Sequence, residues 1–84
     1  MVKRFFGNHT YKMSSNLASR LKELRKAKKI SQARLAEELG FSTSFFGELE
    51  MGRTSVSTDT LVLLADYFGV STDYLLGRTN SPLK

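Results

Sequence analysis

Residues 31–50 read SQARLAEELGFSTSFFGELE, and this stretch decides the fold. It begins with Ser31, whose hydroxyl can cap a helix by accepting a hydrogen bond from a backbone amide two or three residues later. Leu35 and Leu39 then recur on one helical face, and Gly40 supplies the positive φ that a tight turn requires. The pattern predicts a short helix between Ser31 and Gly40.

A second helix follows this turn. Ser42 is its cap candidate, and Gly52 ends it. Phe46 and Leu49 lie three residues apart on its inner face. Two helices that meet at roughly 90–120° through a short turn need a small residue where their backbones approach, and Ala36 is in position to be that residue. The stretch therefore predicts a helix-turn-helix.

Three more helices flank this unit. Upstream, leucines at positions 17, 21 and 24 recur at i, i+4 and i+7, which predicts a helix over residues 16–28. Downstream, helices are predicted over residues 58–68 and 72–76, each opened by Ser or Thr and closed by glycine. No segment alternates with period two over enough residues to indicate a strand, so the predicted fold class is all-α with five short helices.

The chain holds one domain, because 84 residues leave room for a single small core. We expect this helix-turn-helix domain over residues 14–77. Residues 1–13 lack a sustained period, and we expect them to form an irregular basic N-terminal arm. Residues 78–84 contain a Ser-Pro pair and are expected to be a C-terminal tail or linker.

Charge is unevenly distributed along the chain. The net charge is +5, but residues 1–30 hold nine Lys or Arg against one Glu, a balance of +8, whereas residues 31–84 balance at −3. Such asymmetry favours a polyanionic partner on one side of the molecule, and a solvated basic helix is the alternative. Charge alone does not decide between the two.

Composition excludes several classes of function. The chain has no cysteine and one histidine, so we expect no disulfide, no metal and no cofactor. It has no phosphate-cradling glycine loop, and its acids are scattered along helices, which argues against an enzyme. No apolar run approaches the roughly 18–20 residues that span a bilayer, so we expect no membrane partner and a cytoplasmic location.

Four segments carry a resemblance to a known family: LKELR at residues 21–25, ISQARLAEELG at 30–40, ELEMG at 48–52 and LADYFGVSTDYLLG at 64–77. Together they resemble the Xre/Cro-type helix-turn-helix regulators, which include many phage repressors, over about residues 16–77. The resemblance implies a compact five-helix lambda-repressor-like domain. It also implies a two-fold dimer on double-stranded operator DNA, with the third helix in the major groove and half-sites about 34 Å apart.

The start of the third helix is the expected base-reading element, because the first turn of a recognition helix reaches base edges. If Phe46 and Leu49 point inward, the opposite flank faces outward. The base-reading candidates on and beside that flank are Thr43, Ser44, Phe45, Gly47 and Glu48. Glu48 can accept a hydrogen bond from cytosine N4, with a solvated surface acid as the alternative. Phe45 is expected at the edge of the core, with a thymine methyl contact as the alternative.

Phosphate contacts are expected around the same helix, because backbone contacts position a DNA-binding protein and base contacts specify its site. The candidates are Gln32, Ser42, Arg53, Thr54, Ser57 and Thr58. The resemblance implies that the Gln32 amide either binds a phosphate or holds the third helix. For Arg53 the alternative is an idle surface charge. Lys3 and Arg4 are possible arm contacts, with a disordered extension as the alternative.

Two further roles are expected away from the bases. The resemblance implies a structural ion pair between Arg25 and Glu50, which would join the first helix to the end of the third. Near the end of the chain, apolar side chains exceed what a monomer of this size needs, which predicts a dimer face. That face consists of Tyr67, Tyr74, Leu75 and Leu76, and the alternative is that the last helix only covers the core.

The function expected from all of this is a sequence-specific transcriptional regulator. A bacterial or phage repressor that occupies a palindromic operator as a homodimer is the leading hypothesis. An antitoxin-like protein that uses the same fold to bind a protein partner, and DNA only secondarily, is the alternative.

Overall fold

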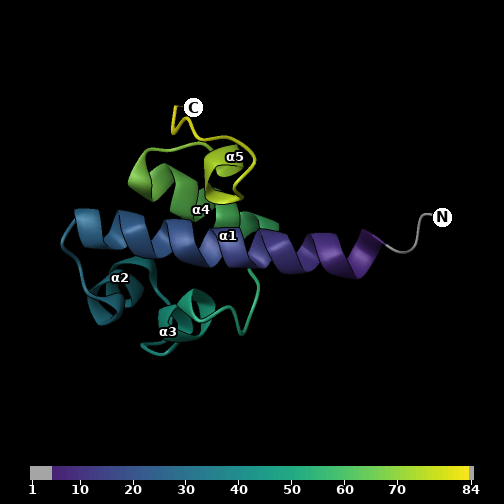
Figure 1. The fold of residues 1–84 in the computed structure, drawn as a ribbon. Coiled ribbons are helices and arrows are strands. Elements are labelled where there is room, and N and C mark those ends of the chain that lie inside the picture. The colour runs from purple at the N-terminus through teal and green to yellow at the C-terminus, as the bar shows by residue number, and fades with distance from the viewer. Residues whose placement is uncertain (1–4, 84) are drawn as a thin grey trace.

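The computed structural model describes the backbone of residues 5–83 and the side chains of residues 16–83. Its helices are α1 (Phe5–Ala27), α2 (Gln32–Leu39), α3 (Phe45–Glu50), α4 (Thr58–Phe68) and α5 (Thr72–Leu75). No strand occurs among the described residues, which agrees with the all-α prediction. In Figure 1, α1 crosses the molecule, with α2 and α3 on one side of it and α4 and α5 on the other.

The first helix is longer than the leucine spacing predicts. It begins at Phe5 instead of near residue 16, so residues 5–13 are helical where an irregular arm was expected. No proline interrupts the helix, and a helix that has already nucleated extends at little cost even through residues without an apolar period. The possible arm contacts Lys3 and Arg4 lie outside the described residues.

Serine caps open three of the helices, as predicted. The Ser31 hydroxyl accepts a hydrogen bond from the Arg34 amide at 3.0 Å. The hydroxyls of Ser57 and Ser71 do the same at the starts of α4 and α5, at 3.1 and 3.0 Å. Each bond satisfies a backbone amide that has no partner inside the helix, which fixes where the helix starts.

The start of α3 differs from the prediction. The N-cap position belongs to Ser44 and not to Ser42, and its side chain makes no capping hydrogen bond. The Phe45 amide donates instead to the Ser42 carbonyl at 3.1 Å. Ser44 therefore already has helical φ and ψ, −87° and −11°, and a cap residue needs an extended backbone to reach forward. Thr43 and Ser44 form a tight turn that leads into α3.

The end of α1 departs from a rule that the other helices follow. Residues in the left-handed region after the helices are glycines at 40, 52, 69 and 77, whereas α1 is followed by Lys29 with φ of 58°. The Ile30 amide donates to the Arg25 carbonyl at 3.2 Å, which closes the helix in the manner of a Schellman motif. A side chain in this region costs free energy that glycine avoids.

The core lies between α1 and the remaining helices. Phe46 and Leu49 are buried, and Ala36 is fully buried on α2, which contacts α3. The predicted close approach of the two helices is therefore present. The other core residues are Leu17, Leu21, Leu35, Leu64, Ala65, Val70 and Leu75. Because both inner side chains of α3 point into this core, the opposite flank of that helix is on the surface.

The segment after α5 folds back onto the domain. The Arg20 guanidinium donates to the carbonyls of Tyr74 and Thr79, at 3.1 and 3.2 Å, and to Asn80 Oδ1 at 3.0 Å. The Ser71 amide donates to the Pro82 carbonyl at 3.2 Å. Residues 78–83, expected as a tail or linker, thus lie against α1 and the start of α5.

Candidate nucleic-acid interface

The exposed edge of α3 begins in the turn before the helix. Thr43, Ser44 and Glu48 are all exposed, and Gly47 is half-buried between them. We call these four residues the reading edge. Phe46 and Leu49 lie on the opposite side of α3 and are buried in the core, so the reading edge faces outward. The edge offers two hydroxyls and one carboxylate, the kinds of group that form hydrogen bonds with base edges.

Phe45 belongs to an aromatic cluster at the rim of the core. Its ring stacks on Phe41, with 4.6 Å between centroids, and meets Phe46 edge-to-face at 5.0 Å. It is half-buried. These contacts agree with the expected position at the edge of the core, and contact with a thymine methyl stays a prediction.

Arg25 and Glu50 form an ion pair behind the reading edge. Arg25 Nε donates to Glu50 Oε2 at 2.7 Å and Arg25 Nη2 donates to Oε1 at 3.1 Å. The two side chains are only 11% and 4% exposed. Hydrogen bonding to Glu50 raises the pKa of the Arg25 guanidinium, so Arg25 stays charged. Arg25 also donates to the Ile30 carbonyl at 2.8 Å, which joins α1 to the turn before α2.

Gln32 extends this pair into a network of three helices. Its Nε2 donates to Glu50 Oε1 at 3.0 Å, so the first residue of α2 holds the last residue of α3. The resemblance implies that the Gln32 amide either binds a phosphate or holds the third helix, and this hydrogen bond fits the second role. A Cβ at Gly47 would lie 3.4 Å from Gln32 Oε1, which places the reading edge directly beside the network.

Glu48 and Arg53 pair with each other on the surface. Arg53 Nη1 lies 3.6 Å from Glu48 Oε2, and the side chains of Arg53 and Glu48 are 63% and 48% exposed. The Arg53 amide also donates to the Glu48 carbonyl at 3.0 Å. Sequence reasoning missed this contact, because it depends on the left-handed turn at Gly52, which brings residue 53 back beside α3. The pair offsets the negative charge of the reading edge.

The remaining phosphate candidates lie in the segments next to the edge. Ser42, Thr54 and Thr58 are exposed. The Ser57 hydroxyl is engaged twice, as the cap of α4 and as a donor to Thr60 Oγ1 at 3.1 Å. Ser57 could still offer a backbone amide to a phosphate, but its hydroxyl already has partners.

The predicted dimer face is wrong at one position. Leu75 has 0% exposure and is a core residue, because α5 turns this side chain towards α1 and α4. Tyr74 is half-buried, with the Arg20 guanidinium 4.1 Å above its ring. Tyr67 and Leu76 are also half-buried. On α4 the exposed apolar side chains are Val62 and Leu63, which the prediction did not include.

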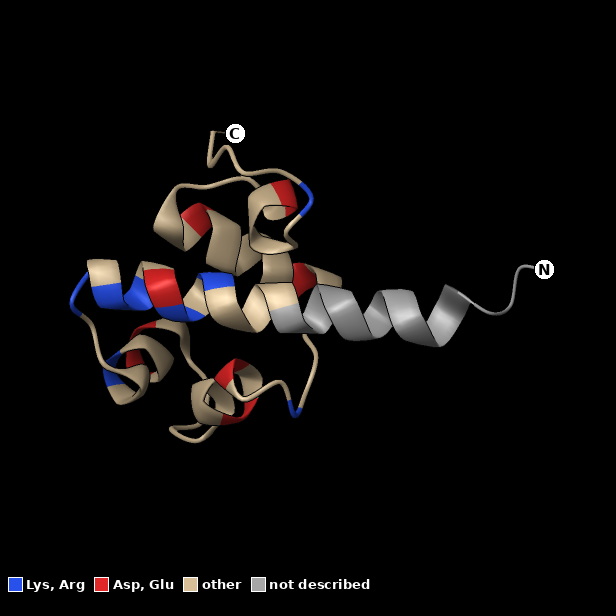
Figure 2. Cartoon of the chain, in the orientation of Figure 1, with Lys and Arg blue, Asp and Glu red and all other residues tan. Residues whose placement is uncertain are grey.

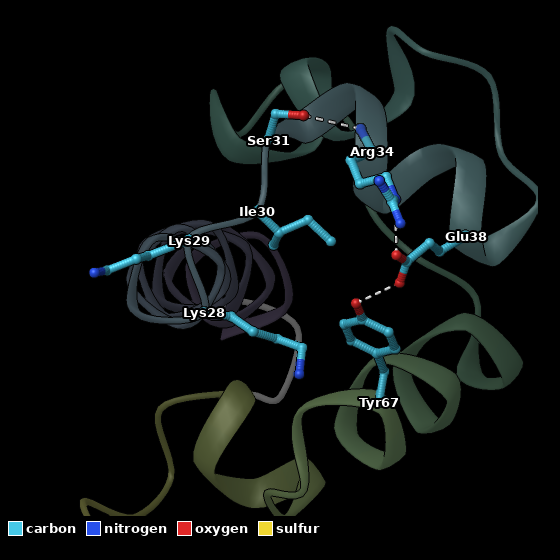
Figure 3. Close-up of a pocket in the computed structure, with 7 residues that line it drawn as sticks. All are labelled: Lys28, Lys29, Ile30, Ser31, Arg34, Glu38 and Tyr67. Atoms are coloured by element: carbon cyan, nitrogen blue, oxygen red, sulfur yellow. Dashed lines mark hydrogen bonds and ion pairs between the residues drawn. The ribbon is translucent and has the colours of Figure 1, made fainter.

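A surface hollow lies where α1 ends, beside α2 and α4. It is lined by Lys28, Lys29, Ile30, Ser31, Arg34, Glu38 and Tyr67 (Figure 3). Tyr67 donates to Glu38 Oε1 at 2.7 Å and Arg34 donates to Oε2 at 2.8 Å. The bond from Tyr67, and then that from Arg34, lowers the pKa of Glu38, and the bond to Glu38 raises the pKa of Tyr67. This contact links α2 to α4 across 29 residues, a separation that no local pattern indicates.

The described residues contain neither a metal-binding cluster nor a membrane-spanning helix. Among the described residues, no group of three or more His, Cys, Asp or Glu side chains could hold a metal ion. Within the same residues, no helix is both long and apolar enough to cross a bilayer.

The fold and its reading edge define a helix-turn-helix protein: two short helices joined by a left-handed turn, with the outer flank of the second one exposed. Comparison with known proteins gives the same answer. Residues 21–75 match the helix-turn-helix family, and the chain belongs to this family.

Similar proteins of known sequence are named as regulators. The chain is 43% identical to the HTH-type transcriptional regulator YobD of Bacillus subtilis over 75% of its own length and 56% of YobD. It is 31% identical to the immunity repressor protein of Bacillus phage phi105, over 74% of this chain and 43% of that protein. The chain spans about half the length of these relatives. Their names agree with the prediction that this chain is not an enzyme.

Solved structures share the fold. The restriction-modification controller protein C.AhdI of Aeromonas hydrophila superposes with a TM-score of 0.66 at 34% identity, over 74% of this chain and 94% of that one. A hypothetical transcription factor from Neisseria, NHTF, superposes with a TM-score of 0.70 at 25% identity, over 76% and 74% of the two chains.

Proposed function

We propose that this chain is a sequence-specific, double-stranded DNA-binding transcriptional regulator that represses by occupying a palindromic operator as a homodimer in the cytoplasm. The observation that carries the proposal is the reading edge: Thr43, Ser44 and Glu48 face solvent at the start of α3 while Phe46 and Leu49 anchor the helix from behind. The relatives named as transcriptional regulators and as an immunity repressor support it.

Sequence preference would come from the reading edge. The hydroxyls of Thr43 and Ser44 can donate to or accept from a base, whereas the Glu48 carboxylate only accepts, and cytosine N4 is the donor it fits in the major groove. Gly47 adds no side-chain group to this edge, and a Cβ there would lie against Gln32 Oε1 at 3.4 Å.

Affinity would come from contacts to the sugar-phosphate backbone on either side. Arg53 leaves Glu48 when Glu48 engages a base, and the guanidinium is then available to a phosphate. Ser42, Thr54 and Thr58 are exposed close by and can donate hydroxyl protons. The backbone amides at the start of α4 add a positive helix end.

A two-fold dimer would repeat this surface on two half-sites, about one helical turn of DNA apart. We place the dimer face on α4 and α5. Tyr67, Tyr74 and Leu76 are half-buried there, and α4 adds the exposed Val62 and Leu63. An isologous interface needs an apolar patch that can pack against its own copy, and these side chains are the candidates for it.

The test is selection of bound sites from random duplexes, with the oligomeric state of the protein measured at the same concentrations. We expect one inverted-repeat sequence to be enriched and a dimer to bind it. Binding without preference for any duplex would contradict the proposed function. Enrichment of a single unrepeated half-site by a monomer would contradict the dimer.

A further inference from the structure

Positive charge in the described chain is concentrated on α1 and not around α3. Residues 16–30 carry six Lys or Arg against one Glu, whereas residues 41–58 carry Arg53 against two Glu. Figure 2 shows this contrast, with basic segments gathered on the later part of α1 and acidic ones on α3. A protein that met DNA through residues 41–58 alone would present a net negative charge, so attraction to the phosphates requires cations from another element.

Three of the six cations have partners within the domain. Arg20 binds the segment after α5, through the carbonyls of Tyr74 and Thr79 and the side chain of Asn80. Arg25 binds Glu50. The Lys28 ammonium lies 5.2 Å from the centre of the Tyr67 ring, a cation–π distance. These groups are already engaged by the domain itself.

The other three cations are Lys22, Lys26 and Lys29. All are exposed, and none forms an ion pair within the part of the chain that the structure describes. Lys22 and Lys26 lie four residues apart on the same face of α1, and Lys29 follows in the left-handed turn after the helix. We call them the lysine row.

The row lies beside the side of α1 that faces α3. Lys22 stands three residues before Arg25 on α1, and Arg25 reaches the end of α3 through Glu50. In Figure 3, Lys28 points towards Tyr67, whereas Lys29 projects from the other side of α1. Lys29 and Lys28 therefore point in different directions, although they are neighbours in the sequence.

We propose that the lysine row binds the phosphate backbone of DNA beside the base pairs that the reading edge contacts. The inference rests on the proposed function and adds the source of its electrostatic affinity. On α1, Lys22 and Lys26 are about 6 Å apart along the helix axis, and one strand of a duplex presents about two phosphates over that length of its axis. The row strengthens binding to every sequence alike, because phosphates carry no sequence information.

The test compares two triple variants of the full chain, matched in charge. The first is Lys22→Gln with Lys26→Gln and Lys29→Gln. The control is Lys28→Gln with Arg34→Gln and Arg78→Gln, which removes the same charge from exposed side chains away from the row. Binding to the selected duplex and to an unrelated duplex is measured across a series of salt concentrations, and circular dichroism checks that both variants are folded.

We expect the lysine-row variant to lower the magnitude of the log-log salt slope by about two to three per protomer on both duplexes. The ratio of the two affinities should stay unchanged, and the control should lower the slope by less than one. Equal slope changes in the two variants, or no change in the lysine-row variant, would overturn the inference. If the unaltered protein preferred no duplex at all, the proposed function itself would fail, which is a different result.

Discussion

The substitution Glu50→Ala should destabilise the domain strongly, because this carboxylate is the centre of the network behind α3. It is 4% exposed and accepts from Arg25 Nε, Arg25 Nη2 and Gln32 Nε2 at 2.7, 3.1 and 3.0 Å. Alanine leaves the guanidinium, 11% exposed, with the Ile30 carbonyl as its hydrogen-bond partner. A buried charge that loses its counter-charge is costly, since neither water nor protein solvates it fully.

The size of the effect follows from that burial. Removing one partner of a buried ion pair costs about 3–5 kcal/mol, against a total stability of about 5–15 kcal/mol for a domain. At about 4–8 °C for each kcal/mol in a domain of this size, the midpoint of thermal unfolding should fall by roughly 12–40 °C. A Glu50→Ala protein at the upper end of this range would therefore be largely unfolded at 37 °C.

The assay is urea unfolding followed by circular dichroism at 222 nm, with two comparison variants. Arg34→Ala breaks the exposed pair with Glu38 and should cost about 0–1 kcal/mol. The double variant Arg25→Met with Glu50→Leu removes both charges and should be more stable than Glu50→Ala. If Glu50→Ala costs no more than Arg34→Ala, the network does not hold α3 and the reasoning is refuted.

Three further predictions concern other parts of the chain. Lys29→Gly should raise the free energy of unfolding by about 0.5–1 kcal/mol, because glycine adopts the φ of 58° without strain; a lower free energy in urea unfolding would count against the Schellman ending of α1. Glu48→Gln should shift the preferred base pair from C·G towards A·T at one position of a selected site, since an amide fits adenine, whereas Arg53→Ala should weaken binding to all duplexes alike; two uniform losses would remove Glu48 from the reading edge. Tyr67→Phe should raise the pKa of Glu38 towards its ordinary value in an NMR titration of the carboxyl group, because the largest cause of the lowering is gone. Because the pKa of Glu38 is lowered in the folded protein, the contact stabilises the fold above the unfolded-state pKa, and this contribution is lost as the pH falls through the folded-state pKa. An unchanged pKa of Glu38 in the Tyr67→Phe variant would show that the hydrogen bond does not form in solution.

Most of the helix boundaries were predictable from sequence because their signals are local. The serine hydroxyls that cap α2, α4 and α5 each accept a hydrogen bond from an amide three residues later. The glycines that follow these helices each adopt a positive φ at one position. The start of α1 was not predictable in this way. A helix can extend through residues that have no apolar face, so its sequence there carries no period to detect.

In the candidate site, too, local features were predictable from sequence, whereas contacts between distant segments were not. The outward flank of α3 follows from the inward position of Phe46 and Leu49, and the structure has both buried. The pair of Glu48 with Arg53 and the bond from Tyr67 to Glu38 depend on how turns and whole helices are placed, which no spacing shows. Leu75 was misjudged because a four-residue helix has too few positions to distinguish its inner from its outer face.

The network of Arg25, Gln32 and Glu50 has a consequence for how such a domain can change its target. These three side chains set the orientation of α3 from its end, while Thr43, Ser44 and Glu48 lie in the turn before it and along its outer flank. No hydrogen bond joins a residue of one set to a residue of the other. Substitutions in the second set should therefore leave the first intact, so under the proposed function one framework could be given a new operator by exchanging a few surface residues.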